Sequence, residues 1–74
     1  MNIEISVKKI ISKITSTPEK DINENTSMEN LSKWDSLAQV KIIIDIEKKY
    51  KKIKTSDLID LTSVKDIVSY LNKK

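Results

Sequence analysis

The middle of the chain contains the stretch Trp34-Asp35-Ser36-Leu37-Ala38-Gln39-Val40, which opens a strongly apolar segment. Asp and Ser often begin helices, because their side-chain oxygens accept hydrogen bonds from the free N–H groups of the first turn. Ser36 and Gln39 also have the spacing of a capping box. The stretch therefore predicts a helix that opens at Asp35-Ser36 and runs to about Tyr50.

The apolar arc of this predicted helix covers more than half of its circumference, which is wider than a surface helix needs. One side carries Leu37, Val40, Ile43, Ile44 and Tyr50. The polar face carries Ala38, Lys41, Asp45, Lys48 and Lys49. Ile42 and Ile46 widen the arc and are expected in the core. Such a helix is either central to a bundle or lines a further surface.

The flanking segments predict the remaining elements. Apolar residues at 3, 7, 10, 11 and 14 indicate a helix over about 2–15 that ends before Pro18. A long polar loop over 18–34 follows, anchored by Ile22, Met28, Leu31 and Trp34. The sequence therefore favours an all-α fold: a small helical bundle of three main helices plus one short helix, with a long loop between the first and second helix.

The last two helices are predicted from their caps. A short helix is expected over 55–60, with Thr55 or Ser56 as its cap. Apolar residues at 64, 67, 68 and 71 indicate the last helix, begun by Thr62 or Ser63. Asp66 is positioned to complete a capping box with Ser63, and Lys73 and Lys74 suit the negative end of the helix.

Composition excludes most kinds of enzyme. The 74 residues contain no Cys, His or Gly, so the chain lacks a thiol nucleophile, the commonest general base and a glycine-rich phosphate loop. No apolar run approaches the roughly 20 residues of a membrane span. The start, Met1-Asn2-Ile3-Glu4, does not resemble a signal peptide. We expect one domain over 1–74, cytoplasmic, without catalytic residues or a metal site.

Ser36 is the residue on which chemistry is expected. Its hydroxyl is placed at the positive end of a helix, where a phosphodiester would lie beside unsatisfied N–H groups. No histidine is available to activate the hydroxyl as a nucleophile. Ser36 is therefore better suited to carry a phosphate-linked group than to attack a substrate.

These residues resemble a known family. Asp35-Ser36-Leu37, followed by Val40, Ile43, Ile44, Ile46, Glu47 and Tyr50, resembles the second helix of the acyl carrier protein family. The stretch Asp21-Ile22-Asn23 to Thr26, with Leu31, resembles the family's loop before the serine, and residues 61–68 resemble its entry to the last helix. The resemblance covers nearly the whole chain.

The resemblance implies that Ser36 carries 4′-phosphopantetheine, transferred from coenzyme A by a separate phosphopantetheinyl transferase. The terminal thiol of that arm would hold acyl groups as thioesters for acyl-loading and acyl-using enzymes of fatty acid or polyketide biosynthesis. Asp35 and Leu37 would lie beside the cofactor, with Asp35 also helping to cap the helix and assisting transferase docking. The implied partner-binding residues of this monomeric carrier are Leu37, Val40, Lys41, Ile44 and Glu47.

The sequence departs from the family pattern in its charge. Family members are typically acidic, whereas this chain has a net charge of +3 and carries Lys41, Lys48 and Lys49 on its second helix. Attraction to basic partners would be weakened or reversed. Trp34 before Asp35 resembles carriers of specialised pathways more than the housekeeping fatty-acid carrier.

The sequence also leaves functions other than the carrier open. The basic run over 48–54 suits a small helical nucleic-acid-binding protein, although the chain has no Arg and lysines also gather at helix C-termini. A carrier of aminoacyl cargo is a further alternative. The loop over 21–25 mimics half of a calcium site, but Thr26 replaces the required Gly. Glu47 is expected as a hydrogen-bonded rim residue rather than the mouth of an acyl crevice.

Overall fold

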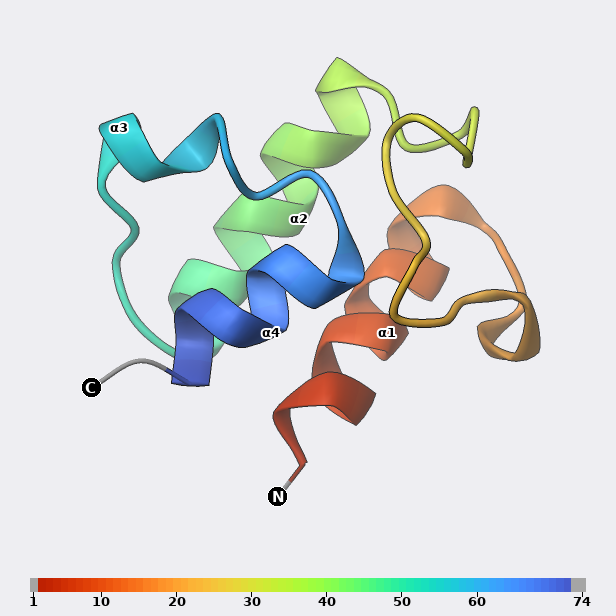
Figure 1. Cartoon of the computed structure of the whole chain (residues 1–74), viewed down its shortest axis with the longest axis horizontal. Coiled ribbons are helices and arrows are strands. Elements are labelled where there is room, and N and C mark those ends of the chain that lie inside the picture. Colours follow the sequence, from red (N-terminus) through yellow and green to blue (C-terminus); the bar gives the residue numbers. More distant parts are fainter. Residues whose placement is uncertain (1, 73–74) are drawn as a thin grey trace.

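The computed structural model describes residues 2–72. In chain order the elements are α1 (Ile3–Thr15), the one-turn 3-10 helix η1 (Glu19–Asp21), α2 (Ser36–Lys49), α3 (Thr55–Leu58) and α4 (Val64–Asn72). This order confirms the predicted all-α fold of three main helices and one short helix (Figure 1). The turn η1, which the sequence did not indicate, lies in the long loop between α1 and α2.

Helix α1 is bounded by two polar residues. The Asn2 side chain accepts hydrogen bonds from the N–H groups of Glu4 and Ile5, at 2.8 and 3.4 Å, and so begins the helix. At the other end Ser16 takes a left-handed conformation with a φ of 54°. Glycine usually supplies this conformation, and the chain has none. The helix therefore ends at the backbone turn of Ser16, two residues before the expected breaker, Pro18.

The core lies where α1 packs against both α2 and α4. Its members are hydrophobic side chains that are less than one-tenth exposed. They are Val7, Ile11, Ile22, Trp34, Ala38, Ile42, Ile43, Ile46, Ile53, Leu61, Val64 and Ile67. The loop anchors predicted from the sequence are confirmed, because Ile22 and Trp34 are buried while Met28 and Leu31 pack half-buried against the core.

The predicted polar face of α2 was wrong at one residue. Ala38 was predicted on that face, but it is 7% exposed and lies in the core with Ile42 and Ile46. The small side chain of Ala38 allows close packing at this point, and its size alone does not indicate burial in a sequence. The buried side of α2 is centred on Ile42 and Ile46, so the expectation that both lie in the core is confirmed.

Backbone hydrogen bonds attach the long loop to the start of α4. The Met28 N–H donates to the Thr62 carbonyl at 2.9 Å, and the Val64 N–H donates to the Thr26 carbonyl at 3.0 Å. An isolated antiparallel bridge joins Ser27 to Ser63. The loop is thus held at its middle as well as at its apolar anchors, although no periodic pattern in the sequence indicated the pairing.

The caps of the last two helices differ in kind. Helix α3 ends at Leu58 rather than Asp60, and its N-cap is Lys54, which makes no side-chain cap hydrogen bond. The prediction that Thr55 or Ser56 caps this helix was wrong, because the chain turns one residue earlier. At the start of α4 the Asp66 N–H donates to the Ser63 hydroxyl at 3.0 Å, so Ser63 fulfils the predicted role. Lys73 and Lys74 lie outside the described residues.

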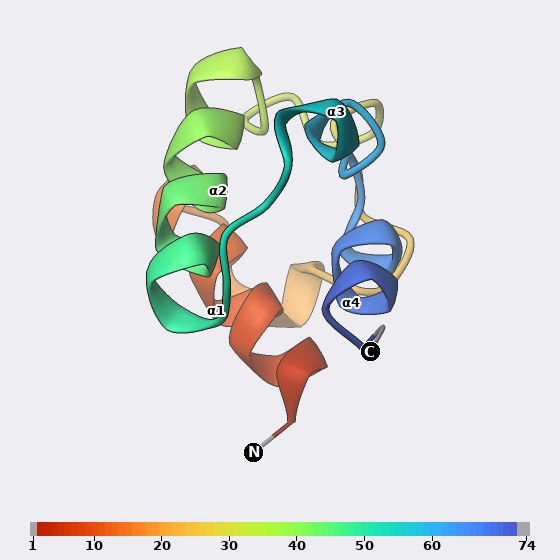
Figure 2. The ribbon, with the colours of Figure 1, turned by 90° about the vertical axis from the view of Figure 1, so that its left-hand side faces the viewer.

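The two ends of the molecule are distinct. Figures 1 and 2 show the start of α2 at one end of the bundle. The start of α1 and the end of α4 both lie toward the opposite end in these views. The long loop leads from the end of α1 to the start of α2.

Two isoleucines on α2 test this packing. Ile46 is fully buried whereas Ile44 is 45% exposed. Ile46→Ala should lower the free energy of unfolding by about 2–5 kcal/mol, because it removes apolar contacts and leaves a cavity. Ile44→Ala, the matched control, should change it by about 0.5 kcal/mol or less. Urea unfolding measures both, and Ile46→Val, with a cost of about 0.5–1.5 kcal/mol, covers the case in which the alanine variant does not fold. Equal costs at the two positions would contradict the orientation of α2.

Candidate functional site

The start of α2 is capped by Asp35. The Asp35 carboxylate accepts a hydrogen bond from the Ala38 N–H at 2.9 Å, and the Asp35 carbonyl accepts from the Gln39 N–H at 2.9 Å. Ser36 is the first residue of the helix and is exposed. The predicted capping box between Ser36 and Gln39 was wrong, because Asp35 provides the cap and the Gln39 side chain binds elsewhere. The Ser36 hydroxyl is therefore not used to start the helix.

Gln39 joins three parts of the chain. Its side-chain carbonyl accepts a hydrogen bond from the indole N–H of Trp34 at 2.6 Å. Its amide group donates to the backbone carbonyl of Leu61 at 2.7 Å. Trp34 is 1% exposed, so it anchors the loop by packing, as expected. The sequence prediction missed this role of Gln39, although the N–H group of a buried Trp usually has a hydrogen-bond acceptor.

The outward side of α2 carries a row of exposed apolar residues. Leu37 is 65% exposed, Val40 is 55% exposed and Ile44 is 45% exposed. Their spacing places them along one side of the helix, next to the exposed side chain of Lys41. We call Leu37, Val40 and Ile44 the α2 stripe. Four of the five predicted partner-binding residues are thus brought together beside Ser36 on an open surface.

Glu47, the fifth predicted partner-binding residue, has a structural contact. Its carboxylate accepts a hydrogen bond from the Ile53 N–H at 2.9 Å, and the residue is half-buried. The expectation of a hydrogen-bonded rim residue is confirmed. This bond ties the end of α2 to the segment that leads into α3.

The calcium-like loop forms an ordinary turn. The Asn25 N–H donates to the Asn23 side chain at 2.8 Å, and the Asn23 N–H donates to the Thr26 hydroxyl at 3.0 Å. Between residues 2 and 72, no group of three or more His, Cys, Asp or Glu side chains is arranged to hold a metal ion. Over the same residues, the helices are all too short or too polar to cross a membrane.

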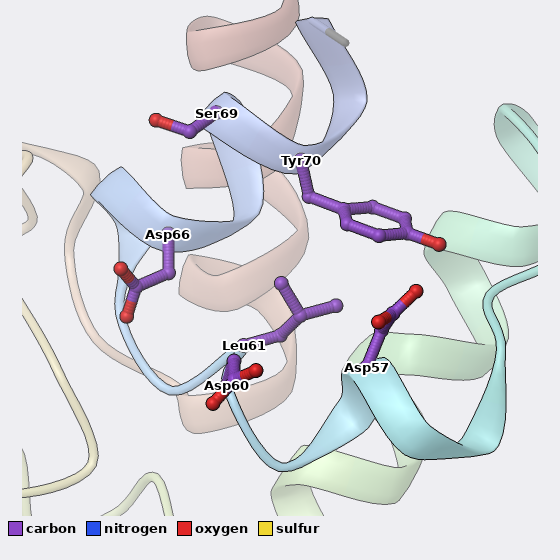
Figure 3. Close-up of a pocket in the computed structure, with 6 residues that line it drawn as sticks. All are labelled: Asp57, Asp60, Leu61, Asp66, Ser69 and Tyr70. Carbon is purple, nitrogen blue, oxygen red and sulfur yellow. The ribbon is translucent and has the colours of Figure 1, made fainter.

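A cavity of about 360 Å³ lies between α3 and α4, away from Ser36. Figure 3 shows Tyr70 extending from α4 toward Asp57 on α3. The pKa of Tyr70 is raised above its ordinary value of 10.0, chiefly by partial burial of the phenol group. A hydrogen bond with Asp57, and repulsion between the Asp57 carboxylate and the ionised tyrosine, raise it further. The Lys51 ammonium also lies 5.0 Å from the centre of the Tyr70 ring. Tyr70 therefore links α4 to α3 and to the segment after α2.

The geometry thus presents an exposed serine at a capped helix start, beside an open apolar surface. Residues 6–71 match the family described as "Phosphopantetheine attachment site". The chain is 37% identical to the acyl carrier protein of Buchnera aphidicola subsp. Schizaphis graminum, over 99% of this chain and 94% of that protein. The chain belongs to the acyl carrier protein family.

Membership of the family decides between the functions left open by the sequence. The cofactor is 4′-phosphopantetheine, held covalently, and the protein is a carrier rather than an enzyme. Acyl carrier proteins receive this group from a phosphopantetheinyl transferase and work with acyl-handling enzymes. The comparisons offer no support for a nucleic-acid-binding protein.

Substitution of Asp35 tests the cap. Asp35→Ala should lower the free energy of unfolding by about 0.5–2 kcal/mol, because the Ala38 N–H loses its partner. Asp35→Asn should retain most of the stability, since Asn is an equally good cap. Urea unfolding of both variants and of Ser36→Ala provides the comparison. A loss in Ser36→Ala as large as that in Asp35→Ala would show that the serine is the true cap.

The raised pKa of Tyr70 predicts a pH dependence of stability. Above pH 10 the unfolded state loses the Tyr70 proton before the folded state does, so the free energy of unfolding should fall as the pH rises through this range. Tyr70→Phe should remove that part of the decline in urea unfolding experiments. In a Tyr50→Phe background, where tyrosinate absorbance reports on Tyr70 alone, Asp57→Asn should lower the Tyr70 pKa. An unchanged pKa would contradict the contact with Asp57.

Proposed function

We propose that Ser36 is the residue to which 4′-phosphopantetheine is attached. The main support for this proposal is that Asp35 caps α2, which leaves the exposed Ser36 hydroxyl available. A phosphodiester on this hydroxyl lies at the positive end of the helix dipole, beside the N–H groups of the first turn. Both effects stabilise its negative charge.

The surroundings of Ser36 fit a group that another enzyme attaches. The Asp35 carboxylate is occupied by the Ala38 N–H, and the chain has no histidine to act as a base. The transferase therefore supplies the base that removes the Ser36 hydroxyl proton. As the new oxygen–phosphorus bond forms, the pyrophosphate bond of coenzyme A breaks and adenosine 3′,5′-bisphosphate leaves. The bound group supplies a terminal thiol, to which acyl groups are linked as thioesters. This accounts for a carrier with no cysteine of its own.

The α2 stripe is the surface on which partner enzymes dock in this proposal. Leu37, Val40 and Ile44 supply apolar contact area, while Lys41 and Glu47 lie beside them as polar contacts. The stripe begins one residue after Ser36, so an enzyme bound there faces the attached arm. Tethering raises the effective concentration of the cargo at the active site of each docked enzyme.

We also propose how many copies of the protein act together and which cargo it carries. Residues 1–74 act as one carrier domain and as a monomer, because the exposed lysine beside the narrow α2 stripe opposes pairing of two copies. The relative from Buchnera favours acyl cargo over aminoacyl cargo. We further propose that the protein serves fatty-acid or polyketide biosynthesis and that it acts in the cytoplasm.

Intact mass tests the attachment residue. The purified chain is incubated with coenzyme A, magnesium and the phosphopantetheinyl transferase of its own organism. Its mass should rise by one phosphopantetheine group, and the mass of Ser36→Ala should not change. The matched control is Ser32→Ala, an exposed loop serine, which should be loaded as fully as the wild-type chain. Loading of Ser36→Ala, or failure of the folded, initially unmodified wild-type chain to be loaded, would overturn the assignment.

A further inference from the structure

Two lysines lie among the exposed apolar side chains of the α2 stripe and its extension along the helix. Lys41 follows Leu37 by four residues, and Lys48 follows Ile44 by four residues, so each lysine lies one turn along the same side of the helix. All four side chains are exposed. Apolar and cationic groups therefore alternate along a surface about 17 Å long, given the rise of an α-helix.

The acidic residues near this face reduce its charge but lie at its margins. Asp45 and Glu47 are half-buried and lie on opposite flanks of the row. The Glu47 carboxylate is directed to the Ile53 N–H, and the Asp35 carboxylate is directed to the Ala38 N–H. The positive end of the helix dipole adds to the field near Ser36. Over residues 35–54 six lysines stand against three carboxylates, so this segment has a net positive charge.

The positive field extends beyond the helix. Lys49, Lys51, Lys52 and Lys54 are exposed at the end of α2 and in the segment that follows it. Charges spread over several turns act together at distances comparable to the Debye length, which is about 8–10 Å in ordinary buffers. Such a field steers an approaching partner of opposite sign before any apolar contact forms.

We infer that the enzymes that dock on α2 present an acidic surface to it, with carboxylates facing Lys41 and Lys48 around an apolar area that receives Leu37 and Ile44. The inference rests on the proposed function, since it names the kind of partner that approaches the Ser36 end of α2. Charge complementarity selects such enzymes and disfavours enzymes with a basic docking surface, because like charges brought together at an interface cost several kcal/mol.

A protein partner fits this face better than a nucleic acid or a membrane. Phosphate recognition favours Arg, and the chain has none. Exposed Leu37, Val40 and Ile44 find complementary apolar groups on a protein but not on a phosphate backbone. A helix that lies in a membrane surface keeps its lysines at the edges of a broad apolar face, whereas here they interrupt a narrow row.

The rate of loading by the transferase of the same organism tests the inference. The double variant Lys41→Glu/Lys48→Glu is compared with Lys9→Glu/Lys20→Glu, which lowers the net charge equally on α1 and η1. At low salt, kcat/KM should fall about tenfold or more in the α2 variant and about twofold or less in the control. The wild-type rate should decrease as salt is added, and the difference between variants should disappear at high salt.

Opposite results overturn the inference. A wild-type rate that rises with salt, or an α2 variant that is loaded as fast as the control, would mean that the docking surface is not acidic. Binding of the wild-type chain, but not of the α2 variant, to phosphatidylserine-containing vesicles or generic duplex DNA, with equal loading rates, would assign the lysines to those partners instead. Intact mass after prolonged incubation separates the two proposals: complete loading of the wild-type chain at any rate preserves the assignment of Ser36, whereas no loading removes both.

Discussion

The side-chain amide of Gln39 is the point on which the arrangement around the start of α2 depends. It accepts a hydrogen bond from Trp34 and donates one to the Leu61 carbonyl, so one residue joins the long loop, α2 and the approach to α4. These polar groups are partly buried, and leaving any of them unpaired would cost about 1–3 kcal/mol. Because Trp34 lies only two residues before Ser36, the same contacts fix the position of the exposed serine. A long loop without glycine thus ends in a well-defined helix start.

Helix α2 has two apolar sides with different roles. Ala38, Ile42 and Ile46 face the core, whereas Leu37, Val40 and Ile44 face outward. The outward side contributes little to folding, and an exposed apolar row on a small domain is typical of an interaction surface. Its interruption by lysines keeps the surface hydrated in the free protein. The wide apolar arc of the sequence is therefore explained by two surfaces, one packed in the core and one exposed to solvent.

Much of the fold could be predicted from the sequence, because apolar periodicity indicates helices and Asp35-Ser36 indicates where α2 begins. The predictions were wrong or incomplete where the type of a side chain says little about its position in the fold. Ala38 is small enough for either face of a helix, and only the packed structure shows that it is buried. The Gln39 contact depends on the carbonyl of Leu61, which is 22 residues away. At the site, the motif predicted Ser36 and a capping role for Asp35, whereas only the actual backbone geometry showed that Ser36 takes no part in the cap.

The placement of the chain ends has a consequence for how this domain can be attached to others. The start of α1 and the end of α4 lie away from the start of α2 (Figures 1 and 2). A tag, an immobilising linker or a neighbouring domain joined at either end would therefore leave Ser36 open to solvent. The fold is suited to display on a surface or in a tandem array, since the start of α2 lies away from the start of α1 and from the end of α4.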